Sequence, residues 1–176
     1  MSKGTGVASI AIILAIAGIG LGAYTIFFQI PDIDPGNIFG RAELRSNQNI
    51  LGSGTYVAAL SSDGMDHNGI DWDSNEHFFT IITPGKYLIC ISITFRPDTI
   101  IQSCVGFLRL NSDKEPLKCY IYINRAYTGT AQTSDMITLK AGDQLRLMGT
   151  MQGQGIISGD AEGSLTFLSI QLVQKT

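Results

Sequence analysis

The sequence predicts an all-β sandwich preceded by one apolar helix, and two patterns lead to this fold class. Beyond residue 55, short segments alternate apolar and polar residues with the period of two that is typical of half-buried strands, and turn-forming residues separate these segments. Before residue 31, the chain is apolar and has no charged side chain other than Lys3. The composition, with 44% hydrophobic and 15% charged residues, is that of a folded protein.

The N-terminal apolar stretch predicts a membrane span. Residues 7–28, as a helix that rises about 1.5 Å per residue, are long enough to cross a hydrocarbon core of roughly 30 Å. We therefore predict an uncleaved transmembrane signal anchor over residues 7–30, in contact with membrane lipid. A secretory signal peptide is the alternative, but its apolar region would be shorter and a cleavage site with small residues would follow it. Here the stretch ends with Tyr24, Phe27 and Phe28, which suit a membrane interface.

Flanking charges predict the orientation of this helix. Lys3 and the free amino group precede the span, whereas Asp32 and Asp34 follow it. The positive-inside rule places a short N-terminus, residues 1–6, in the cytoplasm and the rest of the chain outside the cell membrane. The expected localisation is therefore a single-pass cell-membrane protein with an extracellular head.

Small residues follow one face of the predicted helix at spacings of three and four, and two of them form a GxxxG motif. Small side chains let helices approach closely in lipid, where packing drives association. The seam predicts helix association, although Gly and Ala are common in such helices in any case. Its residues are Ala8, Ala11, Ala15, Gly18 and Gly22.

A second interpretation of the N-terminus starts from Lys3 and Gly4. This dipeptide, directly before an apolar helix, resembles the leader of archaeal type IV pilins, in which a peptidase cuts after the glycine. The freed helix would pack into a filament core, and a β-sandwich head would decorate it. The alternative function is therefore a structural subunit of a surface filament or coat.

Residues 31–54 contain two prolines and several glycines but no sustained periodicity, so we predict a stalk or linker there and the head over residues 55–176. The clearest strand of the head covers residues 86–95, and residues 117–123 and 143–151 repeat its alternation. About eight to ten short strands indicate a sandwich or barrel. The apolar face of the clearest strand consists of Tyr87, Ile89, Ile91, Ile93 and Phe95.

Several motifs of the head occur together in a known order. WDSNEHFFT (72–80), then TPGKY (83–87) and an alternating strand, are followed by LRLN (108–111) and by MITLKAGDQLRL (136–147). This series resembles complement component 1q-like globular heads, which read "aspartate … F-T-x-x-x-P-G-x-Y" and later "L-x-L-x-x-G-D-x-V-x-L". GSLTFL (163–168) would be the final strand, and it lacks the family's usual Gly-Phe pair.

The resemblance covers roughly residues 55–174 and extends to the tumour-necrosis-factor-like superfamily. It implies a jelly roll of about ten antiparallel strands that packs as a compact homotrimer and recognises a ligand with its outer loops. It also implies binding rather than catalysis. We therefore expect a membrane-anchored surface recognition or adhesion module, with copies of itself and an unidentified protein or glycan as its partners.

The residues themselves also argue against catalysis and against nucleic-acid binding. The chain has two histidines, His67 and His77, and no motif of a hydrolase, a metalloprotease or a P-loop enzyme accompanies them. We expect both histidines to be solvated loop or strand-edge residues. No basic run occurs, and beyond residue 30 the chain carries 11 Lys and Arg against 15 Asp and Glu, which disfavours nucleic acid as a partner.

Residues 63–76 concentrate five carboxylates and two side-chain amides within fourteen residues. Calcium takes six to eight oxygen ligands, and heads of the resembled family sometimes bind it. The segment misses the EF-hand register, because Ile70 occupies a ligand position. We consider a calcium site, as the one candidate cofactor, alongside a solvated acidic loop. The candidate ligands are Asp66, Asn68, Asp71 and Asp73.

Cys90, Cys104 and Cys119 lie in apolar or alternating segments and form no CxxC pair. We expect buried free thiols in the core, with one disulfide and a leftover thiol as the alternative in an extracytoplasmic head. Their isolation excludes the ligand spacing of a zinc site. Trp72 is expected to be a packed plug at the sandwich edge, or else an aromatic that contacts a ligand.

Overall fold

The computed structural model describes residues 38–62, 69–98, 103–121, 123 and 127–176. The predicted N-terminus (1–6), the predicted anchor (7–30) and its helix-association seam lie outside these residues and stay predictions. Among the residues that the structure describes, no helix is long and apolar enough to span a membrane. The chain divides into two compact units, residues 1–35 and 36–176, and all strands below belong to the second.

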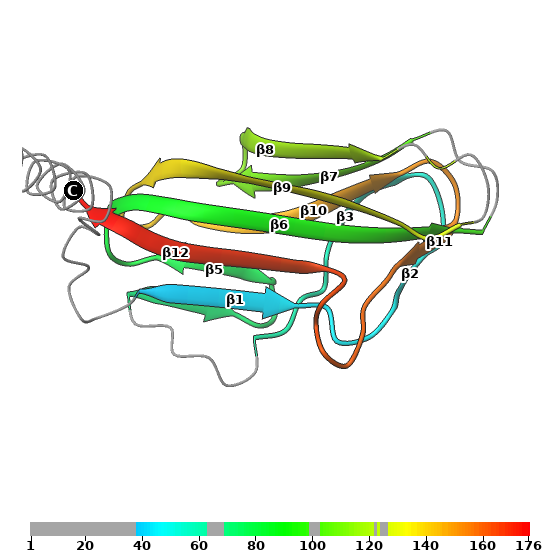
Figure 1. Cartoon of the computed structure of the whole chain (residues 1–176), viewed down its shortest axis with the longest axis horizontal. Helices are drawn as coiled ribbons and strands as arrows, with labels where there is room; N and C mark the ends of the chain where they lie inside the picture. Colours follow the sequence, from blue (N-terminus) through cyan, green and yellow to red (C-terminus); the bar gives the residue numbers. More distant parts are fainter. Residues whose placement is uncertain (1–37, 63–68, 99–102, 122, 124–126) are drawn as a thin grey trace, which may run out of the picture. The chain divides into compact units, whose positions relative to one another are not determined.

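Two antiparallel sheets form this unit, and Figure 1 shows their strands running side by side. The first sheet has the order β1-β12-β6-β11-β2, with β9 on the other edge of β6. Its strands are β1 (Phe39–Glu43), β2 (Gln48–Ile50), β6 (Gly85–Pro97), β9 (Gly129–Leu139), β11 (Gly155–Ile157) and β12 (Phe167–Lys175).

The second sheet has the order β4-β5-β10-β7-β8, and β3 also pairs with β10. Its strands are β3 (Gly54–Val57), β4 (Ile70–Asp73), β5 (Phe78–Ile81), β7 (Cys104–Leu110), β8 (Lys114–Ile121) and β10 (Gln144–Met151). The prediction of an all-β sandwich is confirmed for the described residues. The described part contains twelve strands, more than the eight to ten predicted, because some strands are too short to show a period of two in the sequence.

The core lies between the sheets and is built around β6. All five side chains of its predicted apolar face are at most 1% exposed. Leu145 and Leu147 of β10 and Leu108 of β7 meet this face from the second sheet and are fully buried. Burial of one such side chain contributes about 1.5–3 kcal/mol. Tyr87 also donates its hydroxyl to Thr83 O at 2.6 Å, so its polar tip is satisfied.

The head begins earlier than the sequence indicates, and this corrects the predicted stalk over residues 31–54. β1 and β2 lie within that range and pair with β12 and β11. The inward positions of β1 include Gly40 and Ala42, whose small side chains give no apolar period. Gly40 lets the strand pack closely on the second sheet, since a Cβ atom at this position would make a tight contact of 3.1 Å with the ring of Phe79.

The edge of β6 that faces β12 and β11 contains a gap that a side chain fills. β6 pairs with β12 as far as Ser92 and with β11 from Phe95 onward. At the gap, the Thr94 N–H donates to Thr166 Oγ1 at 3.0 Å, and Thr166 Oγ1 donates to Ser158 O at 2.7 Å. Thr166 is fully buried and replaces a backbone partner of β6. The predicted final strand over residues 163–168 is therefore wrong in its first four residues, since β12 starts at Phe167.

The loop that carries Thr166 is closed by Asp160. Its carboxylate accepts the Ser164 N–H at 2.7 Å and the Ser164 hydroxyl at 2.6 Å. These hydrogen bonds lower the pKa of Asp160. The carbonyl of Leu165 accepts the hydroxyl groups of Ser92 and Thr94 at 2.9 and 3.0 Å, so the loop is bound to β6 at several points.

The substitution Thr166→Val tests this arrangement. It keeps the shape of the side chain but leaves the buried Thr94 N–H and Ser158 O without a partner, so we expect the free energy of unfolding to fall by about 1–3 kcal/mol. Denaturant unfolding of the full-length chain, followed by circular dichroism, measures the loss. Thr138→Val, on the exposed face of β9, is the matched control and should change stability by less than about 0.5 kcal/mol. Equal stabilities of both variants would contradict the role given to Thr166.

Candidate functional site on the outward sheet faces

The structure describes two of the four candidate calcium ligands. Asp71 and Asp73 lie on β4, two residues apart and therefore on the same side of the strand. Asp66 and Asn68, like His67, lie outside the described residues. Within the described part, no group of three or more His, Cys, Asp or Glu side chains is placed to hold a metal ion. The calcium site stays a prediction.

Local hydrogen bonds shape the turn between β4 and β5. Asp73 Oδ1 accepts the N–H groups of Asn75 and Glu76, each at 2.9 Å. His77 has a φ of 56°, which is uncommon for a residue with a side chain, and its Nδ1 lies 2.8 Å from Leu60 O. His77 is therefore half-buried and connects the turn to a neighbouring segment. It directly precedes β5, which agrees with the strand-edge position that was one of the two predicted.

Trp72 is packed against the core, as the plug interpretation predicts. Its ring centroid lies 4.7 Å from that of Phe79. Its backbone N–H donates to Asp71 Oδ1 at 3.0 Å. The indole Nε1 is buried and has no hydrogen-bond partner among the residues that the structure describes. Trp72 thus covers the edge of the sandwich between β4 and β5.

The three cysteines are free thiols in two different settings. Cys104 and Cys119 are buried in the core, as expected. Burial raises the pKa of Cys104 to about 11 and also raises that of Cys119, where a hydrogen bond with the backbone of Gly106 partly opposes the shift. Cys90 corrects the prediction, because it points away from the core and is only half-buried. It belongs to the outward face of the first sheet.

This outward face is uncharged over its centre. Leu88 in β6 lies opposite Met136 in β9, and these two side chains are 37% and 54% exposed. Cys90 lies between Ser134 of β9 and Ser169 of β12, so small side chains occupy the middle. We call this surface the neutral face, and its residues are Leu88, Cys90, Gln132, Ser134, Met136, Phe167, Ser169 and Gln171.

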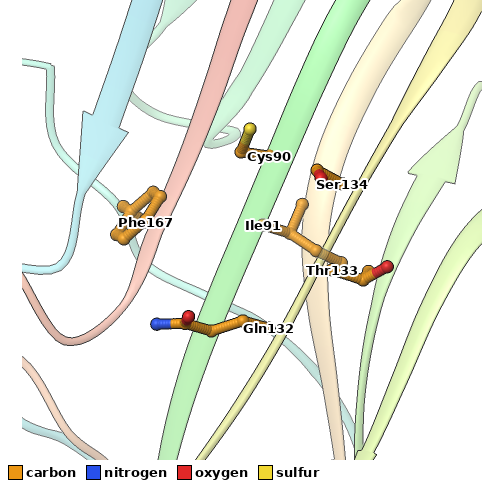
Figure 2. Close-up of a pocket in the computed structure, with 6 residues that line it drawn as sticks. All are labelled: Cys90, Ile91, Gln132, Thr133, Ser134 and Phe167. Carbon is orange, nitrogen blue, oxygen red and sulfur yellow. The ribbon is translucent and has the colours of Figure 1, made fainter.

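A shallow hollow of about 250 Å³ opens on the neutral face. Figure 2 shows Phe167 on one side of it and Ser134 on the other, with Cys90 between the two strands that carry them. The hollow forms because the register neighbours of Cys90 are small. Gln132 and Thr133 complete its lining together with the strand segment at Ile91. The face is therefore uncharged and open at its centre, whereas at its rim the guanidinium of Arg41 covers Phe167, with Cζ 4.0 Å from the ring centroid.

The outward face of the second sheet has a different character. Phe78, Phe107 and Met148 are buried there but lie outside the core cluster. The guanidinium of Arg146 covers Phe78, with Cζ 4.8 Å from the ring centroid, and that of Arg109 lies 5.6 Å from the centroid of Phe107. We call this surface the arginine face and define it by these five residues. Sequence patterns did not indicate it, because only the strand register brings them together.

Comparisons with known proteins place the fold. Neither family models nor curated proteins gave a match. Among solved structures, the Eiger TNF of S. frugiperda matches with a TM-score of 0.63 and 14% identity, over 80% of this chain and 94% of that one. The globular domain of the zebrafish complement 1qA protein matches with a TM-score of 0.56 and 12% identity, over 78% and 99%. Murine APRIL at pH 5.0 gives 0.56 and 13%, over 76% and 98%.

The described domain has a jelly-roll fold similar to that of TNF-like domains. Its structural neighbours are TNF-like domains and a complement 1q globular head, in agreement with the motifs of the sequence. Because the identities lie between 12% and 14%, the likeness concerns the fold of the jelly roll. Its motifs occupy the expected places. Pro84 precedes β6, and the turn that connects β9 of the first sheet to β10 of the second contains Asp143, which accepts the Lys140 N–H at 2.8 Å.

The buried thiol of Cys104 predicts a pH dependence of the jelly roll. Its pKa is 9.0 as a model thiol and about 11 in the fold, so the unfolded chain loses this proton first as the pH rises. The stability contributed by the neutral thiol is therefore present below pH 9 and is lost between pH 9 and about 11. Denaturant unfolding of the full-length chain across this range measures the slope. Cys104→Ala should make the slope shallower.

A matched core variant separates this effect from packing. Ile93→Val also removes buried volume but no titratable group, since Ile93 is fully buried in β6. It should lower stability by a similar amount at every pH and leave the slope as in the wild type. If Cys104→Ala had the wild-type slope as well, the thiol would not contribute to the alkaline loss.

Proposed function

We propose that the chain is a surface recognition or adhesion module, with a signal anchor over residues 7–30, an extracellular jelly-roll head and a homotrimeric assembly. The fold supports a binding role, because its structural neighbours include TNF-like domains and a complement 1q head. The small-residue seam of the predicted helix also favours association of the chains. The partner outside the trimer would be a protein or a glycan.

The neutral face is the observation that carries the trimer. Leu88 and Met136 expose apolar surface side by side, and charged residues lie only at the border of the eight residues, where Arg41 is paired with Glu43 and Lys86 is exposed. Identical copies that meet through it therefore bury apolar area without opposing like charges. Its small central residues allow backbones to approach closely. These properties match the uncharged core of an interface between subunits.

The sheet edges favour association through a face over the addition of strands. At the edge strand β9, Asp135 Oδ1 accepts the N–H of Met136 at 2.7 Å. At the edge strand β4, Asp71 occupies the N–H of Trp72 in the same way. The edge strand β8 contains Pro116, which has no N–H to donate. Fewer amide donors thus remain for pairing with a strand of another chain.

The double substitution Leu88→Lys, Met136→Lys tests the trimer. It places two positive charges per copy on the neutral face, so we expect the full-length chain in uncharged detergent to change from trimer to monomer. Light scattering coupled to size exclusion measures the mass of the protein part. Ile82→Lys is the matched control, because Ile82 is 57% exposed outside the neutral face, and it should stay trimeric. A monomeric wild type, or a trimeric double variant, would refute this assembly.

The N-terminus separates this proposal from the filament or coat subunit. An uncleaved anchor leaves residues 1–4 on the protein purified from its native membrane, apart from loss of the initiator methionine. Mass spectrometry of the N-terminal peptide should therefore detect Lys3. A peptide that starts directly after Gly4 would favour the pilin-like alternative, in which the helix packs in a filament.

A further inference from the structure

The arginine face contains two like charges in direct opposition. Arg109 of β7 and Arg146 of β10 are register partners, so they lie on the same side of adjacent strands. Opposite residues of antiparallel strands have Cβ atoms about 4.5–5.5 Å apart, where like charges are unfavourable. The pairing of these two arginines therefore does not stabilise the sheet.

The two guanidinium groups are also held in place but poorly satisfied. Their side chains are 33% and 30% exposed, and each lies over a buried phenyl ring. Arg146 donates one hydrogen bond, at 3.3 Å to Glu76. Among the described residues, the only polar contact of Arg109 is Glu115 at 3.9 Å, and Glu115 is held more closely by Lys118 at 2.5 Å. A guanidinium has five N–H donors, so most donors of the pair have no acceptor in the part of the chain that the structure describes.

We propose that Arg109 and Arg146 form a binding site for a carboxylate side chain of a protein partner. The planar fork of a guanidinium matches the two oxygens of a carboxylate, and an anion between the two groups offsets their mutual repulsion. The phenyl rings of Phe78 and Phe107 fix the positions of the guanidinium groups before the ligand arrives. The site rests on the proposed recognition role and names the chemistry of its partner.

The surroundings of the pair favour a protein over a polyanionic glycan. Asp73 of β4 lies beside Phe78 in the register, and Glu76 lies beside Arg146. Glu115 neutralises Lys118, which lies opposite Phe107. These acids cancel the broad positive field that would attract a sulfated polymer, while a single carboxylate still fits between the guanidinium groups. Tyr120 of β8 is 68% exposed on the same side, as its register partner Val105 shares the outward face with Arg109. Arg and Tyr together are typical of the residues that dominate protein interfaces.

Fluorescence anisotropy tests this site with the full-length chain in uncharged detergent at constant ionic strength. The probe is a labelled peptide of glycines with two glutamates, and its control carries glutamines instead. We expect saturable binding of the glutamate peptide, about tenfold or more tighter than that of the glutamine peptide. Arg109→Lys and Arg146→Lys keep the charge but lose the fork, so each should weaken binding about tenfold.

Arg45→Lys is the matched control, because Arg45 follows β1 and pairs with Glu43 of that strand at 3.3 Å, away from the arginine face. Peptide binding by this variant should stay within about twofold of the wild type. Light scattering of the Arg109→Lys and Arg146→Lys variants should still give the mass of the trimer, so that weaker peptide binding is not caused by a loss of assembly. Equal affinity for the two peptides would overturn the proposal, even if no variant folded. Wild-type affinity of the double variant Arg109→Lys, Arg146→Lys would overturn it as well. Tighter, arginine-dependent binding of heparin would assign the face to a glycan and refute the protein partner.

Discussion

The backbone hydrogen bonds along both edges of β6 hold the head together. β9 pairs with this thirteen-residue strand along one edge, while β12 and then β11 pair with it along the other. The alternation of β6 then sends one set of side chains into the core and the other set onto the neutral face. A change in its register would reverse both surfaces at once, since the side-chain period of a strand is two. The core and the neutral face thus lie on the two sides of one strand.

A strand can be predicted from the sequence when its pattern of side chains repeats within the strand itself. Long strands with large apolar side chains, such as residues 86–95, reveal themselves because the period of two repeats several times. β1 does not, because Gly40 and Ala42 occupy its inward positions and the strand spans only five residues. The segment before β12 was predicted as strand from its place in the family resemblance, but it is a loop in which the side chain of Thr166 replaces a backbone partner of β6.

The candidate sites show the same limit more strongly. Cys90 could be assigned to an outward face from the alternation of β6, but its two serine neighbours come from β9 and β12, far away in the sequence. Arg109 and Arg146 are separated by an entire hairpin and by β9, and only the register of β7 and β10 brings them together. Sequence patterns predict which side of a strand a residue occupies. They do not predict its neighbours across the sheet.

The gap along β6 has a consequence for how this fold can vary. Thr166 and Ser158 bind β6 at the ends of the interruption. The peptide between them therefore contributes no backbone hydrogen bond to the pairing of β6 with its neighbouring strands. Ala161 and Glu162 at its tip are exposed. Extra residues inserted at this tip would extend into solvent and leave both neighbouring strands in register. The head thus has a position where a longer, variable segment could be displayed beside the neutral face without rebuilding the sandwich.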